Sequence, residues 1–315
     1  MTPRAPEVSV ILPCRDRPAL LLRALASVRA QSFPDWEAIV ADDASPVPLG
    51  PVAAGLGDPR IRTLRLDRNL GPAGAREAAL AQARGRWAAL LDSDDVWRPE
   101  KLARQLARMA EGPPRVLVAA AEVHGPRGAR VRPARATRPG ERIASFLYRA
   151  NQFAQASGVL APLALARAAG FGGLHQYEDH FHLIRAEALG APVEVAAEPL
   201  FDQTDDAPDR LGARDDPARA RAFLAAAAPM LTRAEAAGFA LRCLGPALAE
   251  ADRPAALRLA LRETLNGGPP GAAAKLILRA AAGGPGYDRL RAAVKASRSS
   301  PSASPRAARP RSAPP

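Results

Sequence analysis

One apolar run in this chain ends abruptly in acidic residues, and it constrains the fold more than any other feature. Residues 87–91 read Trp-Ala-Ala-Leu-Leu, and Asp92, Ser93, Asp94 and Asp95 follow directly. A short, uninterrupted apolar run is typical of a strand that is buried on both faces, as in a parallel sheet. Carboxylates at the carboxyl end of such a strand lie where open α/β sheets bind their ligands. An isolated acidic turn also suits the cap of a following helix, so the rest of the chain decides between a site and a cap.

Segments with strand and helix patterns alternate through the amino-terminal part of the chain. The pattern predicts strands at 8–12, 36–41, 61–66, 87–91, 116–121 and 193–196, and helices that begin near Pro18 and at 72–84, 99–110, 162–169 and 177–189. Such alternation implies an α/β fold with a mostly parallel sheet and right-handed crossovers. Asp42 and Asp43 follow the second strand as Asp92 follows the fourth, so these acids are expected at the same edge of the sheet. Residues 124–142 are rich in Gly, Pro and Arg and read as a long loop, where substrate contacts are often carried.

The remainder of the chain is predicted to be helical and then disordered. Residues 213–295 form an Ala/Leu/Arg-rich helical extension, whose leucines fit helices packed on the sheet domain and also fit a basic helix at a membrane surface. Residues 296–315 carry four arginines and no acid, which supplies +4 of the net charge of +12 and predicts a disordered basic tail. Aromatic residues make up 4% of the chain and no nucleic-acid-binding signature is present, so we expect no nucleic-acid partner.

The cysteines and the amino terminus bear on the cellular compartment. Cys14 and Cys243 fit neither a disulfide framework nor a metal-binding spacing, which favours two free thiols in a reducing compartment. Residues 1–7 lack the apolar core of a signal peptide, and no apolar run approaches the length that spans a membrane. We therefore expect a cytoplasmic protein, with peripheral contact at the inner membrane face left open.

Five short motifs follow one another in a set order. They are VSVILPCRDR at 8–17, QSFPDWE at 31–37 with DDAS at 42–45, NLGPAGAR at 69–76, DSDD at 92–95 and Glu-Asp at 178–179. In this order and spacing they resemble the family 2 glycosyltransferases, which have the GT-A fold and transfer sugars from nucleotide donors with inversion. The resemblance covers about residues 8–204. It implies a Rossmann-like catalytic domain over 1–212, with a nucleotide-sugar half at about 1–121 and an acceptor half at about 122–212.

The same resemblance assigns residues that bind the metal and the donor. A divalent metal, Mn²⁺ or Mg²⁺, would be held by Asp94, the last carboxylate of the DxD motif, with Asp92 as its helper. Carboxylate oxygens are the ligands that such hard cations prefer, and the cation would neutralise the diphosphate as it leaves. Asp43 matches the aspartate that hydrogen-bonds the nucleotide base, and Arg76 is expected to pair with phosphate. Three further residues of these motifs are expected to contact the donor: Pro13, Arg15 and Ser93.

Asp179 is the candidate general base. Inverting transfer requires a carboxylate opposite the leaving group, where it takes the proton of the acceptor hydroxyl. Acids at the start of a helix also suit the helix dipole. It is therefore the match of Glu178 and Asp179 to the family's ED motif that gives Asp179 this role.

The resemblance thus implies a metal-dependent, inverting glycosyltransferase of the hexosyltransferase type. The donor is expected to be a UDP-sugar, because a carboxylate at Asp43 suits the imide N–H of uracil. The acceptor is expected to be a hydroxyl of a glycan or of a lipid-linked sugar, in polysaccharide biosynthesis.

Two other functions stay open. A nucleotidyltransferase would require a glycine-rich loop after the first strand to hold a triphosphate, whereas residues 13–18 contain arginines and no glycine. A catalytically silent relative would bind nucleotide and act as a scaffold subunit without turnover.

Overall fold

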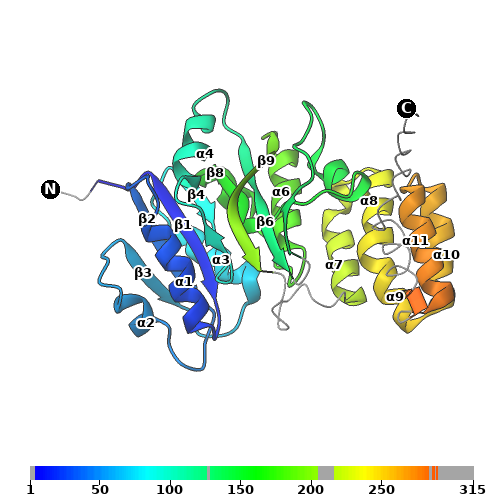
Figure 1. Ribbon diagram of the computed structural model, residues 1–315, viewed down its shortest axis with the longest axis horizontal. Helices are drawn as coiled ribbons and strands as arrows, with labels where there is room; N and C mark the ends of the chain where they lie inside the picture. The colour runs from blue at the N-terminus through cyan, green and yellow to red at the C-terminus, as the bar shows by residue number, and fades with distance from the viewer. Residues whose placement is uncertain (1–3, 126–127, 205–215, 284–285, 288, 290–315) are drawn as a thin grey trace, which may run out of the picture.

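The computed structural model describes residues 4–125, 128–204, 216–283, 286–287 and 289. A sheet flanked by helices forms one part of the molecule, and a group of helices lies beside it (Figure 1). The strands are β1 (Val8–Cys14), β2 (Trp36–Asp42), β3 (Ile61–Arg65), β4 (Trp87–Leu90), β5 (Val96–Trp97), β6 (Val116–Gly125), β7 (Gly128–Arg132), β8 (Val159–Pro162) and β9 (Val193–Thr204). The helices between them are α1 (Pro18–Arg29), α2 (Gly50–Ala54), α3 (Gly71–Gln82), α4 (Lys101–Met109), α5 (Leu163–Ala169) and α6 (Glu178–Ala188).

The strand order of the sheet is β3-β2-β1-β4-β8-β6-β9-β5, and β7 pairs with β6 outside this path. Strands β3, β2, β1 and β4 run parallel to one another, with Val8 opposite Trp36 and Cys14 opposite Asp42. The predicted parallel arrangement is confirmed for this half. Beyond β4, the antiparallel β8 joins β4 to β6, so the sheet as a whole is mixed.

The two faces of the sheet are covered by different helices. On one face, Val10 and Leu12 of β1 pack against Leu21 and Leu25 of α1. On the other face, Ile11 packs in a cluster that includes the small residues of α3 and the apolar side of α6. Because alternate residues of a strand point to opposite faces, a strand buried on both faces has to be almost wholly apolar, and in β1 the buried polar exception, Ser9, donates a hydrogen bond to Glu37.

Three parts of the sheet differ from the predictions. The supposed loop at 124–142 contains β7, an exposed strand that pairs antiparallel with β6 and begins at Gly128, whose φ of +92° suits a glycine. The late strand, predicted at 193–196, continues to Thr204, and an irregularity in its pairing with β6 accommodates Pro199. The short strands β5 and β8 were not predicted, since two to four residues carry too little pattern to detect.

The region that follows the sheet is helical. Its helices are α7 (Pro217–Ala227), α8 (Arg233–Phe239), α9 (Gly245–Ala251), α10 (Arg253–Leu265) and α11 (Pro270–Ala282). Phe223 of α7 and Phe239 of α8 stack at 4.3 Å between ring centroids, and both meet Tyr148, which lies in a π-helical turn at Ser145–Arg149. These aromatic contacts join the helical region to the sheet part.

The leucines of the helical region fall into two groups. Leu241, Leu244 and Leu248 are buried, as expected for helices that pack on the sheet part. The leucines of α10 at 257, 261 and 265 are exposed. No helix among the described residues is long and apolar enough to cross a membrane. The predicted boundary at 212–213 and the predicted tail at 296–315 lie outside the described residues.

Candidate functional site

A cleft of about 960 Å³ opens at the carboxyl edge of the parallel strands. Every residue to which the sequence assigned a metal, donor or catalytic role lines it: Pro13, Arg15, Asp43, Arg76, Asp92, Ser93, Asp94 and Asp179. Most of these residues come from the ends of β1, β2 and β4, which lie side by side because the three strands are parallel. Asp179 reaches the same cleft from the start of α6. The cleft thus brings together motifs that are far apart in the sequence.

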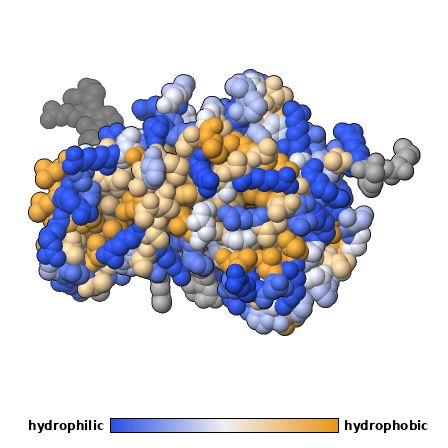
Figure 2. Space-filling view, turned by 180° about the vertical axis from the view of Figure 1, so that it is seen from behind, coloured by the Kyte–Doolittle hydropathy of each residue, from blue (hydrophilic) through white to orange (hydrophobic). Residues whose placement is uncertain are grey.

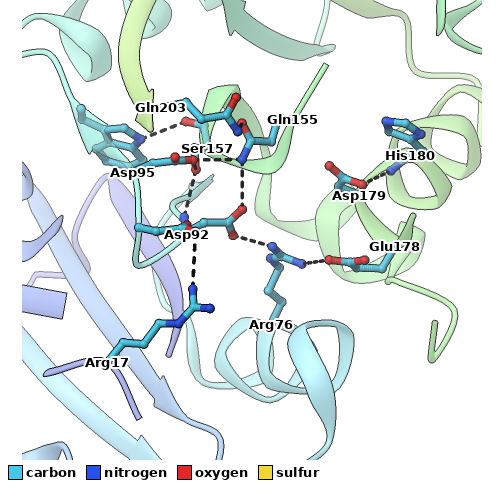
Figure 3. Close-up of polar contacts among 12 residues, drawn as sticks. Arg17, Arg76, Asp92, Asp95, Gln155, Ser157, Glu178, Asp179, His180 and Gln203 are labelled. Carbon is cyan, nitrogen blue, oxygen red and sulfur yellow. Dashed lines mark hydrogen bonds and ion pairs between the residues drawn. The ribbon is translucent and has the colours of Figure 1, made fainter. Parts of the chain in front are cut away.

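A buried arginine connects the two sides of this cleft (Figure 3). The Arg76 side chain on α3 is 3% exposed. Its Nη2 donates to Oδ1 of Asp92 at 2.5 Å, and its Nη1 donates to Oε1 of Glu178 at 2.8 Å. Asp92 follows β4 and Glu178 begins α6, so one side chain holds the ends of two separate elements.

The charges of this triad depend on one another. Burial alone would lower the pKa of Arg76, but the nearby charges of Asp92 and Glu178 outweigh it and raise that pKa above its ordinary value. Burial raises the pKa of Glu178, Arg76 opposes this rise, and the neighbouring Asp179 adds to it. Arg76 therefore stays a cation, and its charge favours the ionised form of Glu178.

The acidic turn after β4 is held by residues that the sequence did not single out. The Ser157 hydroxyl accepts from the Asp92 backbone N–H at 3.0 Å and donates to Oδ2 of Asp95 at 2.6 Å. Gln155 Nε2 donates to the same Asp95 oxygen at 3.0 Å, and Gln203 Nε2 donates to Gln155 Oε1 at 2.7 Å. These contacts fix the backbone of the turn and leave Asp92 directed toward Arg76. No local pattern around residues 155–157 would have revealed this role.

Asp94 lies on the other side of the turn and meets α1 and the loop before it. Its carboxylate Oδ2 is 3.5 Å from Arg17 Nη1, and its carbonyl oxygen accepts from Arg23 Nη2 at 2.6 Å. Arg17 lines the cleft but was not predicted as a site residue. Its only sequence signal was its place in VSVILPCRDR, the motif that also supplies Pro13 and Arg15.

The two acids at the end of β2 differ in their surroundings, since Asp42 is the last residue of the strand and Asp43 follows it. Asp42 is buried and accepts from the Ser45 and Leu49 N–H groups and from Arg65. Burial tends to raise the pKa of Asp42, but these hydrogen bonds lower it overall, so Asp42 is a structural anion. Asp43 lines the cleft, and its Oδ1 accepts from the Leu70 N–H at 2.7 Å.

Glu178 and Asp179 also differ in their surroundings (Figure 3). Glu178 turns to Arg76, whereas Oδ1 of Asp179 accepts from the His180 backbone N–H at 2.8 Å. The residue before them, Tyr177, has φ +63°, a strained conformation for a side chain of its size, and it too lines the cleft. His180 lines the cleft beside them, with its Nδ1 3.1 Å from the Tyr148 hydroxyl.

A cluster of potential metal ligands lies outside the cleft. In the described part of the chain, Glu122, His124 and Asp202 have ligand atoms within 4.8 Å of one another, and none of the three lines the cleft. Arg98 forms ion pairs with both of the acids, so one cation already lies beside them. The aspartates at 92 and 94 are not part of this cluster.

Comparison with known proteins agrees with the arrangement of the motifs. A family model described as "Glycosyl transferase family 2" matches residues 9–172. The succinoglycan biosynthesis protein ExoO of Rhizobium meliloti (strain 1021) is 41% identical over 105 residues, which cover 33% of this chain and 30% of that protein. An Escherichia coli protein named UDP-Glc:alpha-D-GlcNAc-diphosphoundecaprenol beta-1,3-glucosyltransferase WfgD is 37% identical over 102 residues, or 32% of this chain and 40% of that protein. The matches thus span well under half the length of these relatives.

A solved structure matches over most of the chain. The crystal structure of S. aureus TarS 1-349 in complex with UDP-GlcNAc has a TM-score of 0.66 and 20% sequence identity. The match covers 93% of this chain and 91% of that one. The likeness supports the GT-A fold, with the helical region included.

Proposed function

Because the chain belongs to glycosyl transferase family 2, we propose that it is an inverting, metal-dependent glycosyltransferase of the hexosyltransferase type. It would move a sugar from a nucleotide donor, a UDP-sugar, to a hydroxyl acceptor in polysaccharide biosynthesis. The observation that carries the proposal is the single cleft that Asp43, Asp94 and Asp179 all line. Such a cleft can hold a base, a diphosphate and an acceptor hydroxyl within reach of one another.

The residues at the turn after β4 fit a divalent cation. Carboxylate oxygens are the ligands that Mg²⁺ and Mn²⁺ prefer. Asp94 is the better candidate for a direct ligand because it matches the last carboxylate of the DxD motif, and Asp92 is held by Arg76 at 2.5 Å. A cation bound there would supply positive charge to the leaving diphosphate. Asp92 would help from its fixed position beside Arg76.

The motif predicts that Arg76 binds a phosphate group of the donor, but in the structure Arg76 binds two acids. Its guanidinium is buried and already contacts Asp92 and Glu178. We propose that its first task is to position these two acids. Arg76 could bind a phosphate of the donor as well as these two acids, through the part of its side chain that lines the cleft.

Asp179 would act as the general base. It is half-buried and lines the cleft, whereas the ion pair with Arg76 is made by its neighbour Glu178. Its carboxylate would take the proton of the acceptor hydroxyl while that oxygen attacks the sugar from the side opposite the leaving group.

The donor and acceptor classes rest on the cleft and on the relatives. A carboxylate at Asp43 suits the imide N–H of uracil, and the names of the related proteins mention UDP-Glc or UDP-GlcNAc. The WfgD name also mentions a diphosphoundecaprenol-linked sugar, which supports a lipid-linked or glycan acceptor here. We also propose a catalytic domain over 1–212 with a helical extension over 213–295. A cytoplasmic location is supported by the two cysteines, which form no disulfide.

The decisive experiment compares the parent with the variant Asp179→Asn and with a control variant on the same helix. UDP release from UDP-glucose and UDP-GlcNAc is measured with Mn²⁺ and with a chelator, first without acceptor and then with lipid-linked sugars. Asp179→Asn should bind UDP and Mn²⁺ as the parent does and lose transfer by about 10²–10⁴-fold. Glu187→Gln, on the same helix but outside the cleft, is the matched control and should transfer normally.

The alternatives give different results in the same assays. Nucleotide binding without any turnover would indicate a catalytically silent scaffold subunit. Release of pyrophosphate from a nucleoside triphosphate would indicate a nucleotidyltransferase. Equal transfer by Asp179→Asn and the parent would remove Asp179 from the mechanism.

A further inference from the structure

Three leucines on α10 are exposed to solvent along one side of the helix. Leu257, Leu261 and Leu265 are spaced four residues apart, so they lie in a row on one face. Their exposed fractions are 37%, 65% and 86% along the helix. Scattered exposed leucines are ordinary on protein surfaces, but an aligned row is not scattered. Together with α11, the helix lies at the end of the molecule opposite the amino terminus (Figure 1).

Basic residues accompany these leucines. Arg258 and Arg262 are exposed, and each follows a leucine of the row by one position. The only acid in 253–265 is Glu263, which is buried and accepts from Arg262 Nε at 2.7 Å. Orange apolar side chains accordingly reach the surface among blue polar ones at the left of Figure 2, the end that α10 and α11 occupy. We call this surface, formed by the leucines 257, 261 and 265 with Arg258 and Arg262, the α10 face.

We propose that the α10 face docks the protein on an anionic lipid bilayer. The transfer of leucine side chains from water to the acyl boundary of a membrane is favourable. The aliphatic part of an arginine side chain can lie along this boundary while its guanidinium stays at the lipid phosphate groups. Each basic side chain near an anionic surface strengthens binding by about five-fold. The α10 face offers both kinds of side chain together and presents no exposed acid of α10 to repel the lipid.

The continuation of the chain adds charge of the same sign. Helix α11 ends at Ala282, beside α10, and contains Lys275 and Arg279 but no acid. From residue 283 to 315 the sequence has seven basic residues and one acid, Asp288. An anionic surface that meets the α10 face would therefore also attract the chain that follows.

The composition of the face argues against a protein partner or a second copy. Residues 253–282 contain no aromatic residue, whereas the residues that dominate the energy of protein interfaces are enriched in Trp and Tyr. In a two-fold dimer the same patch faces itself. The row of Arg258 and Arg262 would then meet its own copy, with like charges opposed.

The test measures binding of the full chain to vesicles by co-sedimentation. Vesicles rich in phosphatidylglycerol should bind the parent at low salt, and pure phosphatidylcholine vesicles should bind it far more weakly. Leu261→Ser/Leu265→Ser should lower the partition coefficient at least about ten-fold, since both side chains are exposed and their loss leaves the core intact. Leu189→Ser is the matched control, because Leu189 is 53% exposed at the end of α6, and it should bind as the parent does.

Three results would overturn the proposal. The parent could stay in the supernatant with anionic vesicles at low salt. The double serine variant could bind as well as the parent, which would assign binding to general charge. The parent could form a dimer in solution while the double serine variant is a monomer, which would show that the α10 face binds a second copy of the chain. Because vesicle binding needs neither donor nor acceptor, its failure is distinct from failure of the proposed transfer reaction.

Discussion

Loss of the Arg76 guanidinium should destabilise the protein strongly. The side chain is 3% exposed and pairs with Asp92 and Glu178. In Arg76→Met the space stays largely filled, but two carboxylates lose their cation. Removing one partner of a buried ion pair typically costs about 3–5 kcal/mol. Because the Asp92 and Glu178 side chains keep 21% and 12% exposure, we expect the lower end of this range, a loss of about 3 kcal/mol in the free energy of unfolding.

This loss should depend on pH in a defined direction. Burial raises the pKa of Glu178 and Arg76 opposes that rise, so the pKa in Arg76→Met should be higher still. A carboxyl whose pKa is higher in the folded state than in the unfolded state costs no stability below the unfolded pKa. The cost then grows as pH rises through the folded pKa. The deficit of Arg76→Met should therefore be largest at about pH 8 and smaller at about pH 5.

Urea unfolding followed by circular dichroism at both pH values measures these effects. Arg104→Met is the matched control, because Arg104 and its partner Glu198 are both exposed, and it should change stability by no more than about 0.5 kcal/mol. Arg76→Met/Glu178→Gln should recover part of the loss, since the amide needs no cation. An Arg76→Met protein within about 0.5 kcal/mol of the parent at about pH 8 would refute the reasoning.

Three further outcomes are expected. Asp94→Asn should lose metal-dependent UDP binding in titration calorimetry with an unchanged melting temperature; binding equal to that of the parent would contradict a metal at Asp94. Burial lowers the pKa of Lys101 well below its ordinary value and disfavours the charged form in the folded state. Lys101→Met should therefore be at least as stable as the parent near neutral pH. The parent should gain stability as pH rises from neutral toward the ordinary pKa of lysine, and the variant should lack this gain. Urea unfolding across that pH range tests this, and a less stable variant at neutral pH would count against it. Truncation after Lys295 should leave melting temperature and UDP release unchanged, and a large loss of either would show that residues 296–315 support the fold.

Much of the parallel half of the sheet could be predicted from local sequence. The runs at 8–12 and 36–41 are apolar except for Ser9 and Glu37, the run at 87–91 is wholly apolar, and these runs form the buried strands β1, β2 and β4. Since parallel strands end at a common edge, the acids after β2 and β4 could be placed together without knowledge of the loops. The prediction extends to Asp43, Asp92 and Asp94, which line one cleft.

The mixed half of the sheet could not be predicted in the same way, because its contacts join residues that are far apart in the sequence. The four-residue β8 pairs with both β4 and β6, and nothing in its own sequence specifies either neighbour. Ser157 holds the turn at Asp92 from 65 positions away, and its side chain type is common in loops. The Arg76–Glu178 contact spans 102 positions. Both residues stand in the motifs of the resemblance, but only Arg76 was predicted as a site residue, and the order of the motifs gave no sign that the two touch.

The Arg76–Glu178 contact explains how Asp179 could be positioned by residues that do not bind its own carboxylate. Successive residues of a helix point in directions about 100° apart, so Glu178 and Asp179 at the start of α6 cannot face the same partner. Glu178 is tied to Arg76, which is tied in turn to Asp92 at the end of β4. The start of α6 is thereby fixed to the turn that carries Asp94, and Asp179 is directed into the cleft from a defined position. On the proposed mechanism, Arg76 is a positioning residue that sets the acceptor side of the cleft against the donor side.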